Sequence, residues 1–197
     1  MPDRGALEVV SAALSPATMG AVAAAALASG DWSELVVAPA LGFLMGVAFL
    51  SIFPMTPIAV EDGVSGLMSQ RIESEEKRIA ILTWSAPVYA VGSVAFVAVG
   101  WDSMAYLAAC YAVASALLAA ITLRFRASLH AAGVSLPAIA LALMRGPPWS
   151  ALLLLLPVVA WARIRAGAHT PSQVAAGAAV GGLVPLALWL LLLRPHP

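Results

Sequence analysis

The sequence has 197 residues, of which 62% are hydrophobic and 10% are charged. Soluble domains contain about half apolar and about a quarter charged residues, so this composition, with a mean hydropathy of +0.95, indicates a membrane protein. Ten basic and ten acidic residues give a net charge of zero, which argues against a nucleic-acid partner. The single cysteine, Cys110, excludes an internal disulfide.

Seven apolar segments follow one another between charged or Pro/Gly-rich breaks. Their ranges are 6–29, 35–54, 79–100, 103–123, 129–144, 149–163 and 173–193. A spanning helix needs about 20 apolar residues, and the connections leave no room for a soluble domain. We therefore expect residues 1–197 to form a single all-α domain, a polytopic transmembrane bundle of six to seven spans with its active site at one membrane face.

The first segment contains Ala26-Leu27-Ala28, which has the small-x-small form of a signal-peptidase site. A signal peptide starts with positive charge, but here Asp3 and Glu8 outnumber Arg4. We therefore expect this segment to be a helix of the bundle.

The fifth and sixth segments are short for spanning helices. Arg145-Gly146-Pro147-Pro148 joins them and predicts a turn, so the pair forms a tight helical hairpin. The seventh segment follows Thr170-Pro171-Ser172-Gln173, in which a threonine cap, a proline at the first helical position and a glutamine three residues after the cap mark a helix start. Small residues four apart, Gly177 and Gly181, indicate close helix packing.

The charges are distributed unevenly along the chain and across the membrane. All ten acidic residues lie at or before Asp102, whereas residues 103–197 hold six arginines and no carboxylate. With seven spans, the connections 55–78, 124–130 and 163–172 share one side with the N-terminus, and that side holds eight of the ten basic residues. By the positive-inside rule we expect a multi-pass protein of the cell membrane with this face in the cytoplasm.

Three clusters on that side have a pattern that orientation alone does not predict. Arg71 and Arg78 are separated by six residues, which places them on the same face of a helix about 10 Å apart. The other two clusters are 127–130, which contains Ser128 and His130, and 163–169, which contains Arg163 and His169 and is followed by Thr170-Pro171-Ser172-Gln173. Arginines, a hydroxyl and two histidines at one membrane face indicate a site for a tetrahedral oxyanion, with groups able to attack or transfer protons.

These clusters resemble the motifs of the type 2 phosphatidic acid phosphatase family, the membrane branch of a superfamily that includes vanadium haloperoxidases and bacterial acid phosphatases. The family motifs are Lys-x6-Arg-Pro, Pro-Ser-Gly-His and Ser-Arg-x5-His-x3-Asp. Here they correspond to Arg71-x6-Arg78-Ile79, Ala127-Ser128-Leu129-His130 and Ala162-Arg163-x5-His169-x3-Gln173. Order and spacing match, and the resemblance covers residues 71 to about 190.

The resemblance implies a catalytic mechanism without a metal or other cofactor. His169 would attack phosphorus to form a phosphohistidine, and His130 would protonate the leaving oxygen and then activate water. The phosphate oxygens would be held by Arg71, Arg78, Ser128 and Arg163. From the residues themselves, the three histidines lack metal-ligand spacing, which also argues against a metal.

Two departures from the motifs bear on activity. Leu129 replaces a glycine at a position where the backbone approaches phosphate in the family. Gln173 replaces the aspartate that orients the nucleophilic histidine and stabilises its positive charge; an amide accepts the same hydrogen bond without the charge. Gln173 also fits a capping box with Thr170, and the two roles are compatible.

Three further arginines on this side, Arg124, Arg126 and Arg165, are interpreted as orientation determinants or headgroup contacts.

The expected function is dephosphorylation of a lipid phosphate or diphosphate, either a polyprenyl phosphate or diphosphate or a lipid like phosphatidic acid. The alternative is a weak or inactive relative that binds phospholipid or phosphorylated lipid. A transporter or channel is disfavoured because the polar groups cluster at one face and not at the bilayer midplane. The expected partners are membrane lipids and the lipid phosphate substrate, and the sequence leaves the oligomeric state open.

Overall fold

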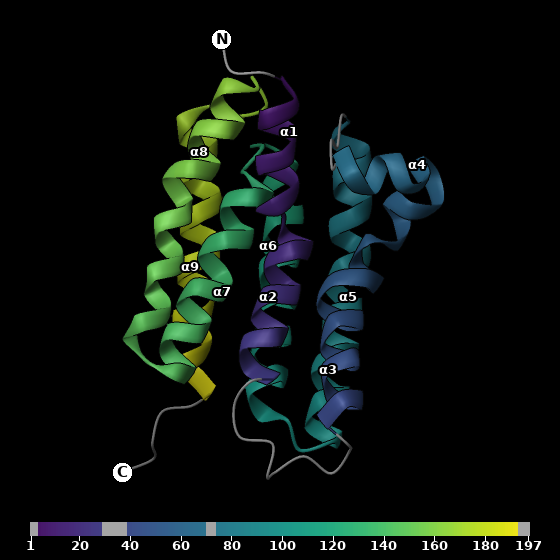
Figure 1. The fold of residues 1–197 in the computed structure, drawn as a ribbon, viewed down its shortest axis with the longest axis vertical. Coiled ribbons are helices and arrows are strands. Elements are labelled where there is room, and N and C mark those ends of the chain that lie inside the picture. The colour runs from purple at the N-terminus through teal and green to yellow at the C-terminus, as the bar shows by residue number, and fades with distance from the viewer. Residues whose placement is uncertain (1–3, 29–38, 70–73, 193–197) are drawn as a thin grey trace.

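The computed structural model describes residues 4–28, 39–69 and 74–192 (Figure 1). The helices are α1 (Arg4–Ala13), α2 (Pro16–Ala28), α3 (Pro39–Val47), α4 (Thr56–Ser69), α5 (Glu75–Ala98), α6 (Asp102–Thr122), α7 (Leu129–Arg145), α8 (Leu156–Arg165) and α9 (Pro171–Leu192). Short helical segments at 48–52 and 53–55 join α3 to α4, and a third at 147–155 leads into α8. No strand occurs within these ranges, so the prediction of an all-α bundle is confirmed.

Five helical stretches are long and apolar enough to cross a membrane: Pro39–Glu61, Glu75–Ala98, Asp102–Thr122, Pro147–Arg165 and Pro171–Leu192. The bent pair of α1 and α2 makes a sixth if it is one span, and the shorter α7 is also apolar. These lengths are compatible with a membrane protein and with the expected six to seven spans. The sixth predicted segment is longer than expected, because residues 147–155 continue directly into α8.

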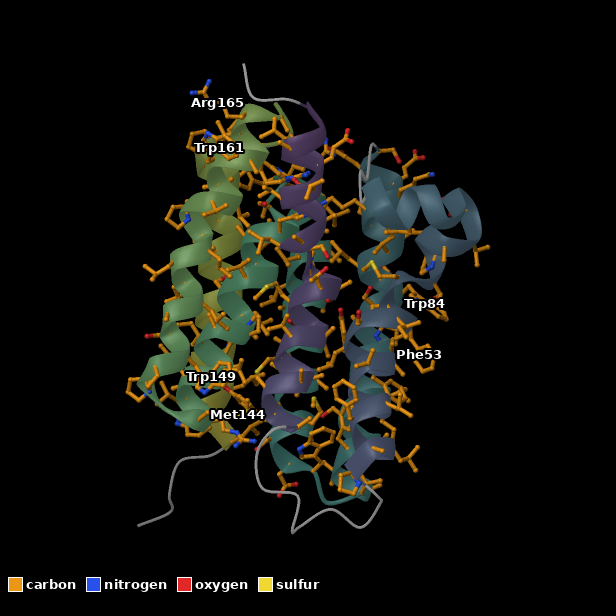
Figure 2. The ribbon with its side chains drawn as sticks, viewed as in Figure 1. Phe53, Trp84, Met144, Trp149, Trp161 and Arg165 are labelled. Atoms are coloured by element: carbon orange, nitrogen blue, oxygen red, sulfur yellow. The ribbon has the colours of Figure 1, made fainter. Side chains whose placement is uncertain are left out.

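The predicted hairpin between the fifth and sixth segments is present. Its turn places Gly146 at a φ of 101°, a conformation that favours glycine, and Pro147 starts the next helical segment. Figure 2 places Met144 and Trp149, on either side of this turn, at the opposite end of the bundle from Arg165. At the hairpin end, Arg145 donates a hydrogen bond to the carbonyl oxygen of Leu27 at 2.8 Å and ties α7 to α2.

Close packing of α9 against α7 depends on glycine. A Cβ atom added to Gly177 would lie 2.1 Å from the carbonyl oxygen of Ser128, and one added to Gly181 would lie 2.1 Å from Ser135 Oγ. The packing role predicted for these two glycines is therefore confirmed. It brings the start of α7 against the first turns of α9.

The helix that carries Arg78 starts later than the sequence suggested. Ser74 caps α5 by accepting a hydrogen bond from the backbone N–H of Lys77 at 3.1 Å, so the helix begins at Glu75. The prediction that Arg71 and Arg78 share one helix is therefore wrong, because the α5 cap interrupts it. Arg71 lies outside the described residues.

A bend between α1 and α2 brings the N-terminal helix over the end of the bundle where α8 meets α9 (Figure 1). The two helices differ in direction by 40°. Ser15 caps α2 by accepting from the backbone N–H of Thr18 at 3.1 Å, and Thr18 Oγ1 donates to the carbonyl oxygen of Ala12 at 2.9 Å. Both bonds fix the angle at which α1 lies against α8.

Candidate active site

One cavity lies where α5, α8 and the connections 123–128 and 166–170 meet. We call this part of the molecule the arginine-rich end. The cavity is lined by Arg78 of α5, Arg126 of the first connection, His130 of α7, Arg163 of α8 and His169 of the second connection. The structure thus brings four of the predicted site residues together, and it adds one arginine that was assigned to orientation.

Arg78 is the first-motif residue that the structure describes, and its side chain is 3% exposed. Its Nε donates a hydrogen bond to Thr122 Oγ1 at 3.1 Å, and its Nη2 donates to the carbonyl oxygen of Ala127. These bonds fasten α5 to both ends of the 123–128 connection. A guanidinium carries five N–H donors, so the remaining ones are available to an anion in the cavity.

Ser128 caps α7 and does not line the cavity. Its Oγ accepts a hydrogen bond from the backbone N–H of Ala131 at 3.4 Å, and its own N–H donates to the carbonyl oxygen of Gln173 at 2.8 Å. The side chain is fully buried. The structure therefore gives Ser128 a capping role, and its predicted contact with phosphate stays a prediction.

His130 lies in the first turn of α7 and is 5% exposed. The backbone of Ser11 forms a hydrogen bond with its ring. Its Nε2 atom is buried and has no hydrogen-bond partner among the described residues. A buried ring nitrogen of this kind is available to accept or donate a proton in the cavity.

His169 is positioned by the turn that ends α8. The backbone N–H groups of Ala168 and His169 both donate to the carbonyl oxygen of Arg163, at 3.0 and 3.3 Å, and Gly167, just before Ala168, has a φ of 67°. This turn returns the chain so that His169 and Arg163 both line the cavity. The spacing of the third motif therefore corresponds to a helix end followed by a glycine turn.

Gln173 fixes the ring of His169 and caps α9 with the same atom. Its Oε1 lies 3.3 Å from His169 Nδ1 and accepts from the backbone N–H of Thr170 at 3.1 Å, while Thr170 Oγ1 accepts from the N–H of Gln173 at 3.3 Å. The backbone N–H of Thr170 donates to this atom of the Gln173 side chain, so the atom is the amide oxygen and can only accept hydrogen bonds. The proton of His169 is therefore on Nδ1, and Nε2 keeps its lone pair. Both expected roles of Gln173 are present.

The environment of His169 keeps its ring neutral. Burial and, after it, the positive charges of Arg163, Arg78 and Arg126 together lower the pKa of His169 to about 4, and the hydrogen bond with Gln173 opposes this shift. At pH 7 the imidazole is uncharged. A neutral imidazole is the form that acts as a nucleophile.

Arg163 reaches across to the N-terminal helix. Its Nη1 donates a hydrogen bond to Ser11 Oγ at 3.3 Å. Ser11 is buried and touches both Arg163 and His130. No motif in the sequence indicated Ser11, because its partners lie more than a hundred residues away along the chain.

The three arginines that were interpreted as orientation determinants or headgroup contacts differ in their exposure to solvent in the structure. Arg124 and Arg165 are exposed, as that role requires, whereas Arg126 is half-buried and lines the cavity. The only feature of the sequence that pointed to Arg126 as a cavity residue was its position immediately before the second motif, two residues from Ser128.

Within the described ranges, no group of three or more His, Cys, Asp or Glu side chains is arranged to hold a metal ion. The cavity instead collects guanidinium groups around two histidines. Guanidinium groups bind the oxygens of phosphate through charge-assisted, often bidentate hydrogen bonds. The arrangement suits a phosphate ester, with the His169 imidazole neutral beside the arginines.

The fold and the site together define a polytopic helical protein with an arginine and histidine site for phosphate esters. A family model, the PAP2 superfamily, matches residues 107–196, a segment that contains the second and third motifs. The resemblance seen in the motifs is thereby confirmed, and it supports a phosphatase acting on phosphate esters. Neither the curated proteins nor the solved structures gave a match.

Proposed function

We propose that the chain is a membrane phosphatase that removes phosphate from a lipid phosphate through a phosphohistidine. The observation that carries the proposal is that Arg78, His130, Arg163 and His169, from four separate parts of the fold, line one cavity. Two of them are guanidinium groups that neutralise phosphate, and two are imidazoles that perform the chemistry.

The lipid class of substrate is supported by the rest of the cavity wall. Below the arginines the cavity is lined by apolar side chains from three helices, among them Ile81 of α5, Leu118 of α6 and Leu136 of α7. Each of these helices contains a long apolar stretch, which would place this part of the cavity wall beside the acyl region of a bilayer. If the headgroup phosphate of a lipid binds at the arginines, the hydrocarbon chain of that lipid would lie against these apolar residues.

The proposed reaction has two steps. In the first, His169 Nε2 attacks phosphorus, the N–P bond forms, the bond from phosphorus to the lipid oxygen breaks, and His130 gives its proton to that oxygen. In the second, His130 takes a proton from water, the water oxygen attacks phosphorus, and the N–P bond breaks to release phosphate. Bound phosphate favours the protonated form of His130 for the first step, because opposite charges stabilise each other. Arg78 and Arg163 neutralise charge on the phosphoryl oxygens throughout.

Phosphate release from purified protein in nanodiscs, with EDTA present, tests this proposal. We expect His169→Ala and Arg163→Ala to reduce the rate by on the order of a thousandfold. Arg165→Ala is the matched control, because Arg165 is exposed two residues from Arg163 and should keep full activity. Full activity in His169→Ala protein that unfolds at the wild-type temperature would refute the mechanism.

We also propose that the arginine-rich end faces the cytoplasm at the cell membrane. The eight-to-two distribution of basic residues supports this orientation. Glu61 is exposed and pairs with Lys77 at 3.3 Å near the start of α5. A Glu61→Cys variant should therefore resist a membrane-impermeant thiol reagent in intact cells and react after permeabilisation, with the fully buried Cys110 unreactive in both. Rapid labelling in intact cells would reverse the orientation.

A further inference from the structure

The cavity continues from the arginines into the bundle, along α5 and α6. Its lining residues run from Arg78 to Tyr89 on α5 and from Leu118 to Tyr111 on α6. At about 1.5 Å per residue, the helical rise from Arg78 to Tyr89 is about 16 Å. The cavity is therefore deep enough to hold part of a hydrocarbon chain as well as a phosphate.

Two tyrosine rings close the inner end of the cavity. The rings of Tyr89 and Tyr111 stack with their centroids 5.1 Å apart and an angle of 29° between their planes. Both residues are buried, with 3% and 4% of their surface exposed. Within α5 and α6, which the structure describes in full, no residue closer to the hairpin end lines the cavity. We call this stacked pair the tyrosine floor.

The bundle is closely packed on the far side of the tyrosine floor. Phe96 of α5 and Met104 and Leu107 of α6, which lie within the next two turns, have no exposed surface and belong to the same hydrophobic cluster as the two tyrosines. The ring of Phe96 also makes edge contacts with the rings of Phe49 and Trp101, at centroid distances of 5.9 and 5.8 Å. Protein interiors of this kind leave few voids. A chain that enters the cavity therefore has to end at the floor or displace these side chains.

The ring of Tyr111, and not its hydroxyl, makes the packing contacts of the floor. Its hydroxyl is buried and has no hydrogen-bond partner among the described residues. By contrast, the hydroxyl of Tyr106 on the same helix donates to the carbonyl oxygen of Pro185 at 2.6 Å and ties α6 to α9. Removing the hydroxyl of Tyr111 should therefore leave the floor in place, whereas removing its ring should open it.

We propose that the tyrosine floor limits the length of the hydrocarbon chain that the site accepts. The inference rests on the proposed function and specifies its substrate, a lipid phosphate whose chain ends at the floor when its phosphate lies at Arg78. A fully extended backbone covers about 3.6 Å with three bonds, so a hydrocarbon chain advances about 1.2 Å per bond and a depth of about 16 Å holds about a dozen carbons. Longer chains must bend inside the cavity or push the two rings apart.

The experiment measures phosphate release by nanodisc-embedded protein from saturated n-alkyl phosphates of about eight to about twenty carbons, at equal mole fractions. Up to the limit, kcat/KM should change little, because lipid tails are as apolar as the cavity wall that replaces them. Beyond the limit it should fall about tenfold, because extra methylene groups in a packed interior force neighbouring side chains to move. A wild-type kcat/KM that is constant over the whole series would overturn the inference.

Two substitutions on α6 should move the limit in opposite directions. Tyr111→Ala opens the floor and should raise kcat/KM for the longest phosphates about tenfold. Ala114→Phe places a ring in the cavity one turn nearer the arginines and should move the limit to chains about four carbons shorter. Two controls should keep the wild-type limit: Tyr111→Phe, which keeps the ring, and Ala116→Phe, which adds the same ring at an exposed position of α6. If Tyr111→Ala and Ala114→Phe reduce activity equally at every chain length, the two positions only pack the bundle and the inference fails.

A binding measurement separates this inference from the proposed function. Saturated n-alkylphosphonates have a carbon in place of the ester oxygen and are not hydrolysed. They should raise the unfolding temperature of wild-type protein up to the same chain length and raise it less beyond, and Ala114→Phe should shorten that length. If wild type hydrolyses none of the alkyl phosphates but the phosphonates show the limit, the proposed function fails and the length limit stands. If it hydrolyses all lengths equally and the phosphonates show no limit, the proposed function stands and the length limit fails.

Discussion

Among the described residues, every arginine and histidine that lines the cavity belongs to helices α5–α9 or to the connections between them, whereas the segment from α1 to α4 supplies apolar walls at Pro16, Met55 and Ile58. The N-terminal segment also supplies Ser11, which contacts Arg163 and His130 from outside. Within α5–α9, the reactive groups lie at helix ends and turns, each fastened by backbone hydrogen bonds. The two regions therefore differ in kind: the C-terminal region holds the chemical groups, and the N-terminal region supports and encloses them.

This difference explains where substitution should matter most. The groups at the arginine-rich end depend on how closely α7 and α9 approach, because Ser128 and Gln173 join the two helices through their backbones. By contrast, α1 meets the site through single contacts. We expect damage at the α7–α9 contact to remove the site altogether and damage at α1 to weaken it.

The largest effect is expected from Gly177→Ala on α9. Its new Cβ would lie 2.1 Å from the carbonyl oxygen of Ser128, a backbone atom that cannot move without disturbing the cap of α7. We expect a loss of activity and a fall of about 2–3 kcal/mol in the free energy of unfolding, measured by thermal unfolding in detergent. Gly182→Ala is the matched control, because its Cβ would meet only Ile139 Cγ1 at 4.0 Å. Similar unfolding temperatures for the two variants would contradict the packing argument.

The next effect concerns the charge that Gln173 lacks. Gln173→Glu keeps the length of the side chain and both contacts of Oε1, with His169 Nδ1 and the Thr170 N–H, and it adds a carboxylate. We expect kcat to rise by roughly ten- to a hundredfold, because the carboxylate stabilises the positive charge that forms on His169. Gln173→Asp, which restores the family residue, should also raise it. Absence of turnover in wild type and in both variants would favour the alternative, a protein that binds lipid phosphate without hydrolysing it.

A smaller effect is expected from Ser11→Ala in α1. The variant loses the hydroxyl that accepts from Arg163 Nη1 at 3.3 Å but keeps the backbone contact with His130. One such hydrogen bond is worth about 1 kcal/mol, so kcat/KM should fall about fivefold. Ser150→Ala, at the hairpin end of the bundle, should leave the kinetics unchanged. A loss as large as that of Arg163→Ala would mean that α1 is part of the catalytic machinery, which would remove the distinction between the two regions.

The smallest effect is a displaced pH profile. Because the pKa of His169 is lowered to about 4, its neutral form persists as the pH falls from 7 to 5, and kcat/KM should decline only as the pH approaches 4. In Gln173→Glu the carboxylate favours the charged imidazole, so the pKa of His169 rises and the acid limb should move to higher pH. An acid limb near the ordinary histidine value of about 6.5 in wild type would contradict the lowered pKa.

Hydropathy and turn chemistry predicted most of the fold. The apolar segments, the hairpin turn at Gly146 and the capping box of Thr170 and Gln173 are local features, and local sequence determines them. The motif spacings also predicted that His130, Arg163 and His169 meet, because each lies in or beside the terminal turn of a helix at the same end of the bundle. In these cases a short stretch of sequence contains the whole physical cause.

The remaining features depend on contacts between distant parts of the chain. Whether Arg126 lines the cavity and Arg124 does not depends on how the 123–128 connection is held by Arg78. Ser11 meets Arg163 only because α1 bends over α8. Apolar composition indicates that a helix can cross a membrane, but it does not indicate which helices lie beside it or how it is rotated about its axis. The sequence therefore gives no signal for the position of Arg126 or for the contact between Ser11 and Arg163.

The single oxygen of Gln173 that accepts from both Thr170 and His169 couples the first turn of α9 to the orientation of the His169 ring, the proposed nucleophile. If that turn frays, the imidazole loses the acceptor that fixes its tautomer, and Nε2 is no longer aimed at phosphorus. Any influence that loosens the N-terminus of α9, such as a thinner bilayer or a detergent that competes for the helix end, would therefore reduce catalysis before the bundle itself unfolds. Thermal inactivation of this protein should precede its loss of helical structure.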